Sequence, residues 1–390
     1  MSRSTDVLDL LAKARPARLD PPSNRGEHTA DAVAAIVTGA SPVEAPARPE
    51  RHRRSRRPRV ALLGALGAAA VVTAVAVAVA VTGPGDAPRR APGAAPAVAS
   101  PATQTPMDSS RLLLVAAERS DSVPPAGGRY LTIQTESGSA VPVKAAGGGY
   151  TMIARSGGQY WLARSSTDRS WVFGQSLGAV PATPGDEDAW RRSGSPSVVR
   201  VTKPKPFDLQ IAPGEIQGNT VDADHLFALG DRNVSQAQLD ALPTDPGPLR
   251  DALLSRFHGG GSDLPTDRDQ WLFTVAANVV IDLPVSNEVR AAAYRMLAAL
   301  PGVRGLGVVH DLRGRPGQAV AYPQDSPGNG RFEVRLIIDP DTGQALGKEL
   351  RAVQPRGRAA WIAPGALFAY QLVLVSEGTD DNPPSVALRD

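Results

Sequence analysis

The sequence predicts an α+β protein: a disordered tail, one transmembrane helix, a proline-rich linker, and an outer domain in which helices pack on a curved antiparallel sheet. Three observations lead to this prediction. An uncharged apolar run follows a cluster of arginines, and a segment with frequent prolines follows that run. All 18 aromatic residues then lie at or after Tyr130, among runs with the spacing of strands or helices. We therefore divide the chain into 1–59, 60–82, 83–106 and 107–390.

The composition of the 390 residues limits the available chemistry. Hydrophobic residues make up 42% of the chain, which is enough for a packed core. Cysteine is absent, so disulfides, thiolate zinc sites, iron–sulfur clusters, cysteine nucleophiles and lipid attachment to cysteine are excluded. The net charge of +3 is compatible with a nucleic-acid-binding protein, and the position of that charge decides whether this class applies.

The positive charge lies in the tail. Residues 1–59 carry 12 basic and 7 acidic side chains, a net +5, whereas residues 60–390 carry 30 and 32, a net −2. Six arginines form a cluster at the end of the tail: Arg51, Arg53, Arg54, Arg56, Arg57 and Arg59. We interpret this cluster as a topology signal and not as a nucleic-acid-binding patch, because it stands directly before an apolar run.

The apolar run covers residues 60–81, which are 22 residues without a charge. As a helix it extends about 33 Å, enough for a bilayer core of about 30 Å. The arginine cluster predicts that 1–59 stay in the cytoplasm and that 107–390 lie outside. The lipid bilayer is then the partner of 60–82, and the protein belongs to the cell membrane. A cleaved signal peptide is the alternative, but the long leader and the long run favour retention.

The segments on either side of the apolar run have different compositions. The tail holds two short helical patterns, after Thr5 and after Thr29, and each is too short to be stable alone. They predict a mostly disordered tail, or one that folds onto a cytoplasmic partner. The linker 83–106 has proline at six positions, so it favours an extended polyproline II conformation.

The outer domain is expected to open with a helix and continue with strands. Asp108 or Ser109 is the predicted N-cap of the helix. Alternating runs predict the strands that follow: 129–135, 150–154, 160–163 and 171–173. The glycine pair in residues 156–159 predicts a tight turn between two of these strands.

Three helices and a second group of strands are predicted next. The helices begin behind Asp245, at a capping box that starts with Thr266, and behind Ser286. The strands cover 303–310, 318–322, 331–338, 346–353 and 366–375. Residues 339–343 supply a turn between two antiparallel strands. Helices clustered beside antiparallel strands indicate an α+β fold, as one domain or as two closely packed halves.

One catalytic pattern is present in the sequence. Residues 174–178 match G-x-S-x-G, the nucleophile elbow, around Ser176. The elbow needs a helix after the serine, and two prolines break the segment that follows. We therefore interpret Ser176 as a turn residue and rank a serine hydrolase last among the candidate functions. We assign no catalytic, cofactor-binding or metal-binding residue, and we expect a protein that is not an enzyme and has no cofactor.

Aromatic residues on the predicted strands are candidates for a binding surface. They are Tyr160, Trp161, Trp171, Phe173, Phe332, Phe368 and Tyr370. If the sheet curves, one of its faces lines an apolar groove for an acyl chain or a peptide. The alternative is that these side chains pack against the three helices.

Four segments carry a family resemblance. They read Leu-Pro-Thr-Asp-Pro-x-x-Leu-Arg at 242–250, Ala-Ala-Ala-Tyr-Arg-Met-Leu-Ala-Ala-Leu-Pro-Gly-Val at 291–303, Asp-x-x-Gly-Arg-x-Gly at 311–317 and Leu-Ile-Ile-Asp-Pro-Asp-Thr-Gly at 336–343. With the arginine-flanked helix, they resemble an uncharacterised family of actinobacterial single-pass membrane proteins, often encoded beside extracytoplasmic-function sigma factors. The resemblance implies a cell-envelope protein with an anti-sigma-like role and assigns no catalytic residues.

Two further comparisons refine this resemblance. The tail lacks the His-x-x-x-Cys-x-x-Cys of zinc anti-sigma factors, because the chain has no cysteine. The strand–turn–strand segments are similar to the curved half-barrel of envelope lipoprotein carriers and of sigma-regulator partner proteins. This second similarity implies a half-barrel sheet in the outer domain.

The expected function follows from this layout. We expect a single-pass membrane protein whose outer domain, 107–390, senses or binds an envelope ligand. The tail, 1–59, is expected to couple to a sigma factor or another cytoplasmic regulator. The alternative is an envelope lipid- or peptide-binding module without signalling. Nucleic acid is not an expected partner.

Overall fold

The computed structural model describes residues 107–145, 148–165, 167–201, 207–221, 227–260 and 265–385. The tail, the transmembrane helix and the linker predicted for residues 1–106 lie outside this described part, and so do the six arginines of the cluster. Within the described part, no helix is both long and apolar enough to span a bilayer.

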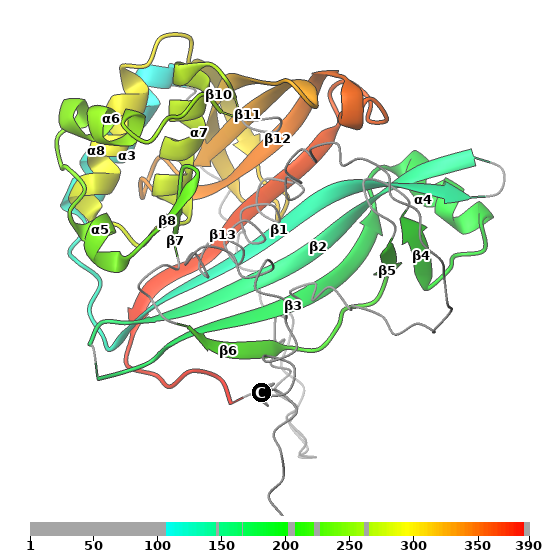
Figure 1. Ribbon diagram of the computed structural model, residues 1–390, viewed down its shortest axis with the longest axis horizontal. Coiled ribbons are helices and arrows are strands. Elements are labelled where there is room, and N and C mark those ends of the chain that lie inside the picture. The colour runs from blue at the N-terminus through cyan, green and yellow to red at the C-terminus, as the bar shows by residue number, and fades with distance from the viewer. Residues whose placement is uncertain are drawn as a thin grey trace, which may run out of the picture.

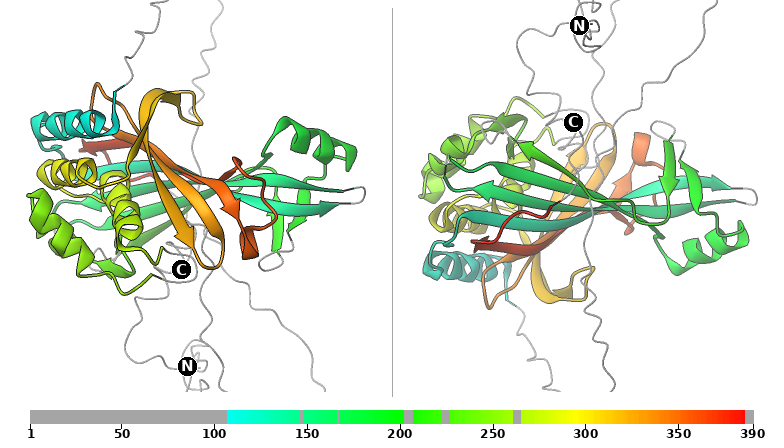
Figure 2. Two further views of the ribbon diagram at one scale, coloured as in Figure 1. Left: turned by 90° about the horizontal axis from the view of Figure 1, so that it is seen from above. Right: turned by 90° about the horizontal axis from the view of Figure 1, so that it is seen from below.

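An antiparallel sheet of eleven strands forms the centre of the structure (Figure 1). The strands are β1 (Tyr130–Ala145), β2 (Gly148–Ala163), β3 (Ser170–Pro181), β4 (Val198–Val201), β5 (Phe207–Gln210), β6 (Gln217–Val221), β9 (Arg304–His310), β10 (Pro316–Ser326), β11 (Gly330–Ile338), β12 (Ala345–Pro355) and β13 (Leu367–Thr379). Their order is β6-β3-β2-β1-β13-β12-β11-β10-β9, with β4 paired to β1 and β5 to β4. The sheet is curved (Figure 2), which confirms the predicted α+β class with a curved antiparallel sheet.

The first and last long strands lie side by side in the middle of this sheet. β1 pairs with β13 from Tyr130 opposite Thr379 to Ser139 opposite Ala369. On its other side β1 pairs with β2 along the whole length of both strands. These two strands have 16 residues each, against about five or six in an ordinary strand. Every predicted run corresponds to a strand and most strands are longer than the runs indicate, but the runs 150–154 and 160–163 belong to one strand, β2.

Helices form a layer on one part of this sheet (Figure 1). They are α3 (Ser109–Ser122), α6 (Pro246–Leu254), α7 (Arg268–Ile281) and α8 (Asn287–Ala298), with the short α5 (Gln236–Asp240) and the hairpin of β7 (Phe227–Leu229) and β8 (Arg232–Val234) beside them. Helix α4 (Pro184–Arg192) lies instead against β2 and β3, and the 3-10 turn η3 (Gly357–Ala359) precedes β13.

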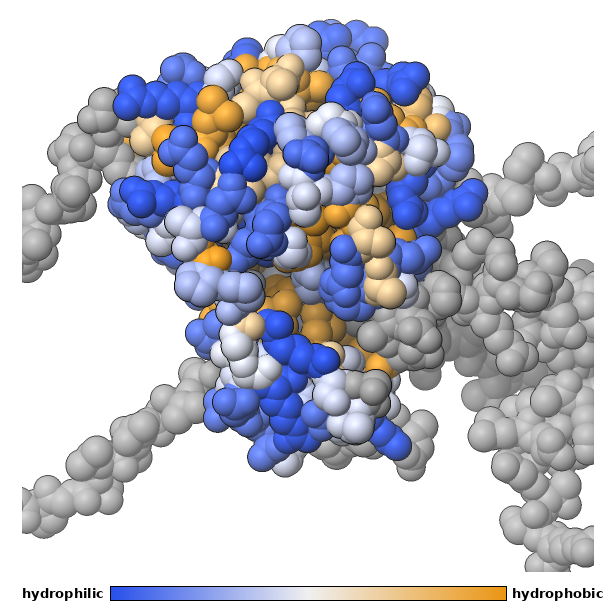
Figure 3. All heavy atoms as spheres, turned by 90° about the vertical axis from the view of Figure 1, so that its left-hand side faces the viewer, coloured by the Kyte–Doolittle hydropathy of each residue, from blue (hydrophilic) through white to orange (hydrophobic). Residues whose placement is uncertain are grey.

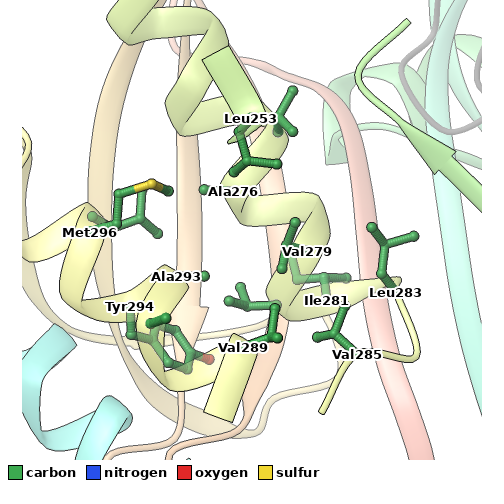
Figure 4. Packing of buried hydrophobic residues seen from close by; sticks show 14 of the residues in the cluster. Leu253, Ala276, Val279, Ile281, Leu283, Val285, Val289, Ala293, Tyr294 and Met296 are labelled. Atoms are coloured by element: carbon green, nitrogen blue, oxygen red, sulfur yellow. The ribbon is translucent and has the colours of Figure 1, made fainter. Parts of the chain in front are cut away.

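The largest hydrophobic core lies between the helical layer and the sheet (Figure 4). Helix α3 packs along α8, and α7 lies against β10 and β12. Phe273 of α7 is fully buried and stacks on Tyr322 of β10, with ring centroids 5.0 Å apart. None of these helices is long enough to be stable alone, so burial of their apolar faces in a shared core stabilises them.

Most predicted helix starts are confirmed. The side chains of Asp108 and Ser286 accept hydrogen bonds from backbone amides in the first turns of α3 and α8, and Asp245 directly precedes α6. The predicted capping box at Thr266 is wrong by one residue. The N-cap of α7 is Asp267, whose carboxylate accepts two backbone N–H groups and adds a favourable charge at the helix N-terminus.

The tight turn predicted at residues 156–159 is wrong, because β2 runs through them without interruption. Glycine is needed there for close packing: a Cβ on Gly158 would lie 2.7 Å from the Oγ1 of Thr135. The reversal between β1 and β2 falls between Ala145 and Gly148 instead. A glycine in an alternating run fits either a turn or a close strand contact, and here the pairing register selects the contact.

Candidate functional site

A hollow lies between the helical layer and the sheet (Figure 3), with apolar side chains at its base and hydrophilic residues around it. The register of β1 and β2 places Ile133 opposite Tyr160 and Leu131 opposite Leu162, all on the face that carries the helical layer. Leu131, Tyr160 and Val373 pack against the main core but are only half-buried. This face, called the concave face below, therefore keeps apolar surface exposed.

The connection between α7 and α8 lies across the concave face. Leu283 and Val285 on this connection are buried beside β13 (Figure 4). Asp282, the C-cap of α7, accepts a hydrogen bond from the Nε2 of Gln371 on β13. The end of α7 is thereby held against the centre of the sheet.

Four polar side chains meet on the concave face: Asn278 of α7, its C-cap Asp282, Lys348 of β12 and Gln371 of β13. Lys348 Nζ donates to Asn278 Oδ1 and lies 3.7 Å from Asp282 Oδ2. Lys348 and Gln371 are direct neighbours across β12 and β13. The side chains of Lys348 and Asp282 are 13% and 20% exposed, so this ion pair is largely desolvated. We call these four residues the Lys348–Asp282 cluster.

The environment of this cluster is apolar. Burial raises the pKa of Asp282, and the ammonium of Lys348 opposes this rise. Burial, with the negative charge of Asp282, raises the pKa of Tyr160 to about 12. Gln371 is 4% exposed, and its Oε1 has no hydrogen-bond partner in the structure. The concave face thus contains a balanced pair of charges and one unsatisfied acceptor, and buried polar atoms are rarely left unsatisfied.

A second polar cluster surrounds Glu136 of β1, on the opposite face of the sheet. The Glu136 carboxylate accepts hydrogen bonds from the hydroxyl of Tyr370 (2.7 Å), from Arg155 Nε (3.1 Å) and from Arg313 Nε (2.8 Å). Burial alone would raise the pKa of Glu136, but the hydrogen bonds from Tyr370 and Arg313 outweigh it and the pKa is lowered. These contacts join β1 to β2, to β13 and to the connection between β9 and β10.

The Asp-x-x-Gly-Arg-x-Gly segment at 311–317 has a structural role. Asp311 is buried and its carboxylate accepts the backbone N–H and the Nε of Arg315, the latter at 2.6 Å. The same guanidinium donates to the carbonyls of Val373 (2.8 Å) and Leu346 (3.0 Å). Gly314 has a φ of +76°, which favours glycine. This connection is therefore tied to β12 and β13.

Ser176 does not lie in a nucleophile elbow. It is in the middle of β3, and its Oγ accepts a hydrogen bond from the N–H of Gly178 (3.1 Å). The strand continues to Pro181, so no helix follows the serine as the elbow requires. Gly178 has a φ of +75° at a register shift between β2 and β3, so the second glycine of the motif serves a bulge.

The aromatic residues singled out in the sequence do not share one face. Tyr160 contributes to the core under the helices. Trp161, Trp171 and Phe173 form a small cluster with Tyr130. Phe332, Phe368 and Tyr370 belong to a third cluster near η3. Consecutive residues of a strand point to opposite faces, which separates Tyr160 from Trp161. Of the seven, only Tyr160 is among the half-buried residues of the concave face.

The described residues contain no group of three or more His, Asp or Glu side chains arranged to hold a metal ion. Two histidines downstream of Ser176, His258 and His310, are exposed in the structure. The polar groups that the structure brings together are instead the Lys348–Asp282 cluster and the Glu136 cluster. Neither cluster was predicted from the sequence.

No family model matches the sequence, and no curated protein matches it. Among solved structures, the chain is similar to a complex of Pseudomonas aeruginosa MucA and MucB, with 10% identity and a TM-score of 0.19, over 68% of this chain and 55% of that chain. It is also similar to a DUF1329 family protein from Desulfovibrio piger ATCC 29098 (10% identity, TM-score 0.16, 68% of this chain and 91% of that chain). A third structure is an outer membrane lipoprotein-sorting protein domain from Vibrio parahaemolyticus (10% identity, TM-score 0.14, 69% of this chain and 92% of that chain). This chain thus spans little more than half the length of the first of them.

Proposed function

We propose that residues 107–390 form an extracytoplasmic domain that binds an acyl chain of an envelope lipid on the concave face. The observation that supports this proposal is the half-buried apolar set of Leu131, Tyr160 and Val373, which packs against the main core on the sheet face that carries the helical layer. Covering this surface stabilises a complex by about 25 cal/mol for each Å² of apolar area removed from water. Small-molecule sites commonly combine such an apolar lining with a few polar groups.

The sequence layout supports a membrane role for the whole chain. The arginine cluster and the uncharged run 60–81 favour a single-pass protein of the cell membrane, with 1–59 inside and 107–390 outside. We further propose an anti-sigma-like role, in which the tail couples ligand binding to a cytoplasmic sigma factor. The motifs between residues 242 and 343 support this part, because they resemble actinobacterial membrane proteins often encoded beside such factors.

The described charged groups favour a binding role over a catalytic one. Glu136 and Asp311 are buried, Glu136 is paired with two guanidinium groups and Asp311 with one, so neither is available to exchange a proton with a substrate. Ser176 lies within a strand and not at an elbow. We therefore propose that the protein is not an enzyme and uses no cofactor.

The lipid-binding proposal predicts where a photoactivatable fatty acid, incorporated into the lipids of living cells, cross-links to the full chain. Cross-links are expected on peptides that contain Leu131, Tyr160 or Val373, in addition to those in 60–82. Leu131→Glu places a charge on the concave face and is expected to reduce the cross-links on the peptides with Leu131, Tyr160 or Val373 at least tenfold. Mass spectrometry of the cross-linked peptides measures both groups, so 60–82 serves as an internal reference.

The matched control for this experiment is Leu114→Glu, because Leu114 lies on α3 and is 46% exposed. It is expected to leave both groups of cross-links unchanged. Cross-links confined to 60–82 in the unaltered protein contradict the proposal. Recovery of a bound peptide in place of lipid contradicts it too.

The topology and the coupling are tested together in cells. A protease added to intact cells from which any outer membrane or wall barrier has been removed is expected to cleave a C-terminal tag and to spare an N-terminal one. After cross-linking, a sigma factor is expected to co-purify with the full chain and not with a chain lacking residues 1–50, which keeps the arginine cluster. A protected C-terminal tag overturns the topology. Equal recovery of the sigma factor from both chains overturns the role of the tail. It does not affect the lipid-binding proposal.

A further inference from the structure

We infer that the lipid held on the concave face has an uncharged, hydroxyl-bearing head group, which donates a hydrogen bond to Gln371 in the Lys348–Asp282 cluster. This inference rests on the proposed function and adds the chemical class of the ligand. The first observation is the Oε1 of Gln371, which is buried with no hydrogen-bond partner in the structure. The Nε2 of the same side chain is already used, since it donates to Asp282. What the site lacks is a donor.

The charges beside Gln371 favour a neutral head group. The Lys348 ammonium and the Asp282 carboxylate are 3.7 Å apart, and each side chain is at most 20% exposed. The carboxylate of Asp282 repels an anionic head group placed there, and the ammonium of Lys348 repels a cationic one. Either adds an unbalanced charge to a poorly solvated pair, which is unfavourable. A hydroxyl supplies the missing donor without changing the charge balance.

The position of Gln371 connects the head group to the apolar surface. Gln371 and Val373 are two residues apart on β13, so both face the same side, about 7 Å from each other along the strand. Val373 is one of the half-buried residues proposed to contact the acyl chain. The first carbons of an acyl chain span this distance. A single amphiphile therefore satisfies Gln371 with its head and covers Val373 with its tail.

The chain contains a matched control for this residue. Gln175 on β3 is also a buried glutamine, 5% exposed, with an Oε1 that has no partner and an Nε2 that donates to the carbonyl of Gly214. Gln175 lies opposite Gly157, which lies opposite Glu136, so this glutamine is on the face away from the concave one. Gln175 is thus a buried amide with an unpartnered oxygen, like Gln371, but it does not lie on the concave face.

The experiment measures equilibrium binding of two radiolabelled probes to the full-length protein in amphipol: 1-mono-oleoylglycerol, with an uncharged dihydroxy head, and oleate, with the same chain and an anionic head. The unaltered protein is expected to bind mono-oleoylglycerol at least tenfold more tightly. Gln371→Leu is expected to abolish this preference while oleate affinity stays within twofold. Gln175→Leu is expected to keep the preference. Gln371→Met is the second variant if Gln371→Leu does not show cooperative thermal unfolding.

The possible outcomes separate the two proposals. Binding of neither probe by the unaltered protein refutes the lipid-binding function itself. Equal binding of both probes refutes the head-group inference and leaves the lipid function standing. A preference that survives in the folded Gln371 variant also refutes the inference, because the hydrogen bond is then made elsewhere.

Discussion

Replacing Glu136 with alanine is expected to lower the free energy of unfolding by about 3 kcal/mol, because the change removes a buried carboxylate and leaves its three partners unpaired. Tyr370 loses its acceptor, and Arg155 and Arg313 lose their counter-charge. The figure is at the lower end for a buried pair, since Arg155 and Arg313 are 28% and 45% exposed and stay partly hydrated. Thermal and denaturant unfolding followed by tryptophan fluorescence measures the change, because all five tryptophans lie between residues 161 and 361.

The effect of Glu136 depends on pH with a defined sign. Its pKa is lowered in the folded protein, so the unfolded chain binds the proton more readily. The stability that Glu136 contributes is therefore fully present above the unfolded pKa, about 4.3, and is lost as the pH falls through the folded pKa. The difference between the unaltered protein and Glu136→Ala should be constant near neutral pH and should shrink below pH 4.

The control for Glu136 is Glu187→Ala. Glu187 forms an exposed i,i+4 ion pair with Arg191, and the two side chains are 44% and 63% exposed. Its removal is expected to change the free energy of unfolding by about 0.5 kcal/mol or less. If Glu187→Ala and Glu136→Ala lower the free energy of unfolding by similar amounts, the contacts of Glu136 do not hold the central strands together.

Truncating Phe273 to alanine is expected to cost about 3–5 kcal/mol, the range for a large aromatic side chain removed from a core. Phe273 is fully buried and its ring stacks on Tyr322 at 5.0 Å, so the change opens a cavity where α7 meets β10. Phe273→Leu keeps most of the volume and is expected to cost about 1 kcal/mol.

Urea unfolding of the purified chain measures the two Phe273 variants, with Leu114→Ala as the exposed reference. Because Leu114 is 46% exposed, its truncation is expected to have an effect below about 0.5 kcal/mol. If Phe273→Ala costs no more than Leu114→Ala, the helical layer does not depend on this contact with the sheet.

Local patterns in the sequence predict much of the fold. Asp108 and Ser286 identify the starts of α3 and α8, because a short polar side chain before an apolar helical pattern can satisfy the first free amides. Alternation identifies the long strands of both halves of the sheet but not the short strands β4, β5 and β6. The register and the strand order are not local properties, and the tight turn placed at 156–159 is wrong for that reason.

The polar clusters depend on contacts between residues that are far apart in the sequence. The three partners of Glu136 are 19, 177 and 234 positions away from it in the sequence. Asp282 and Gln371 are 89 positions apart. One signal for the Lys348–Asp282 cluster does exist: Lys348 alternates with Leu346 and Leu350, so it occupies a position of β12 that the pattern would assign to an apolar residue.

The pairing of β1 with β13 has a consequence for how the chain is made. Between Glu136 and Tyr370 the ribosome adds 234 residues, which takes roughly 10–50 s at the usual rates of synthesis. During this time β1 has an unpaired edge, and so does β12 once it is made, because β13 joins both. Open edges of long strands recruit other strands, so the nascent chain is prone to aggregate until its last strand emerges. A nonsense mutation before β13 should therefore yield aggregated chains and not a smaller folded domain.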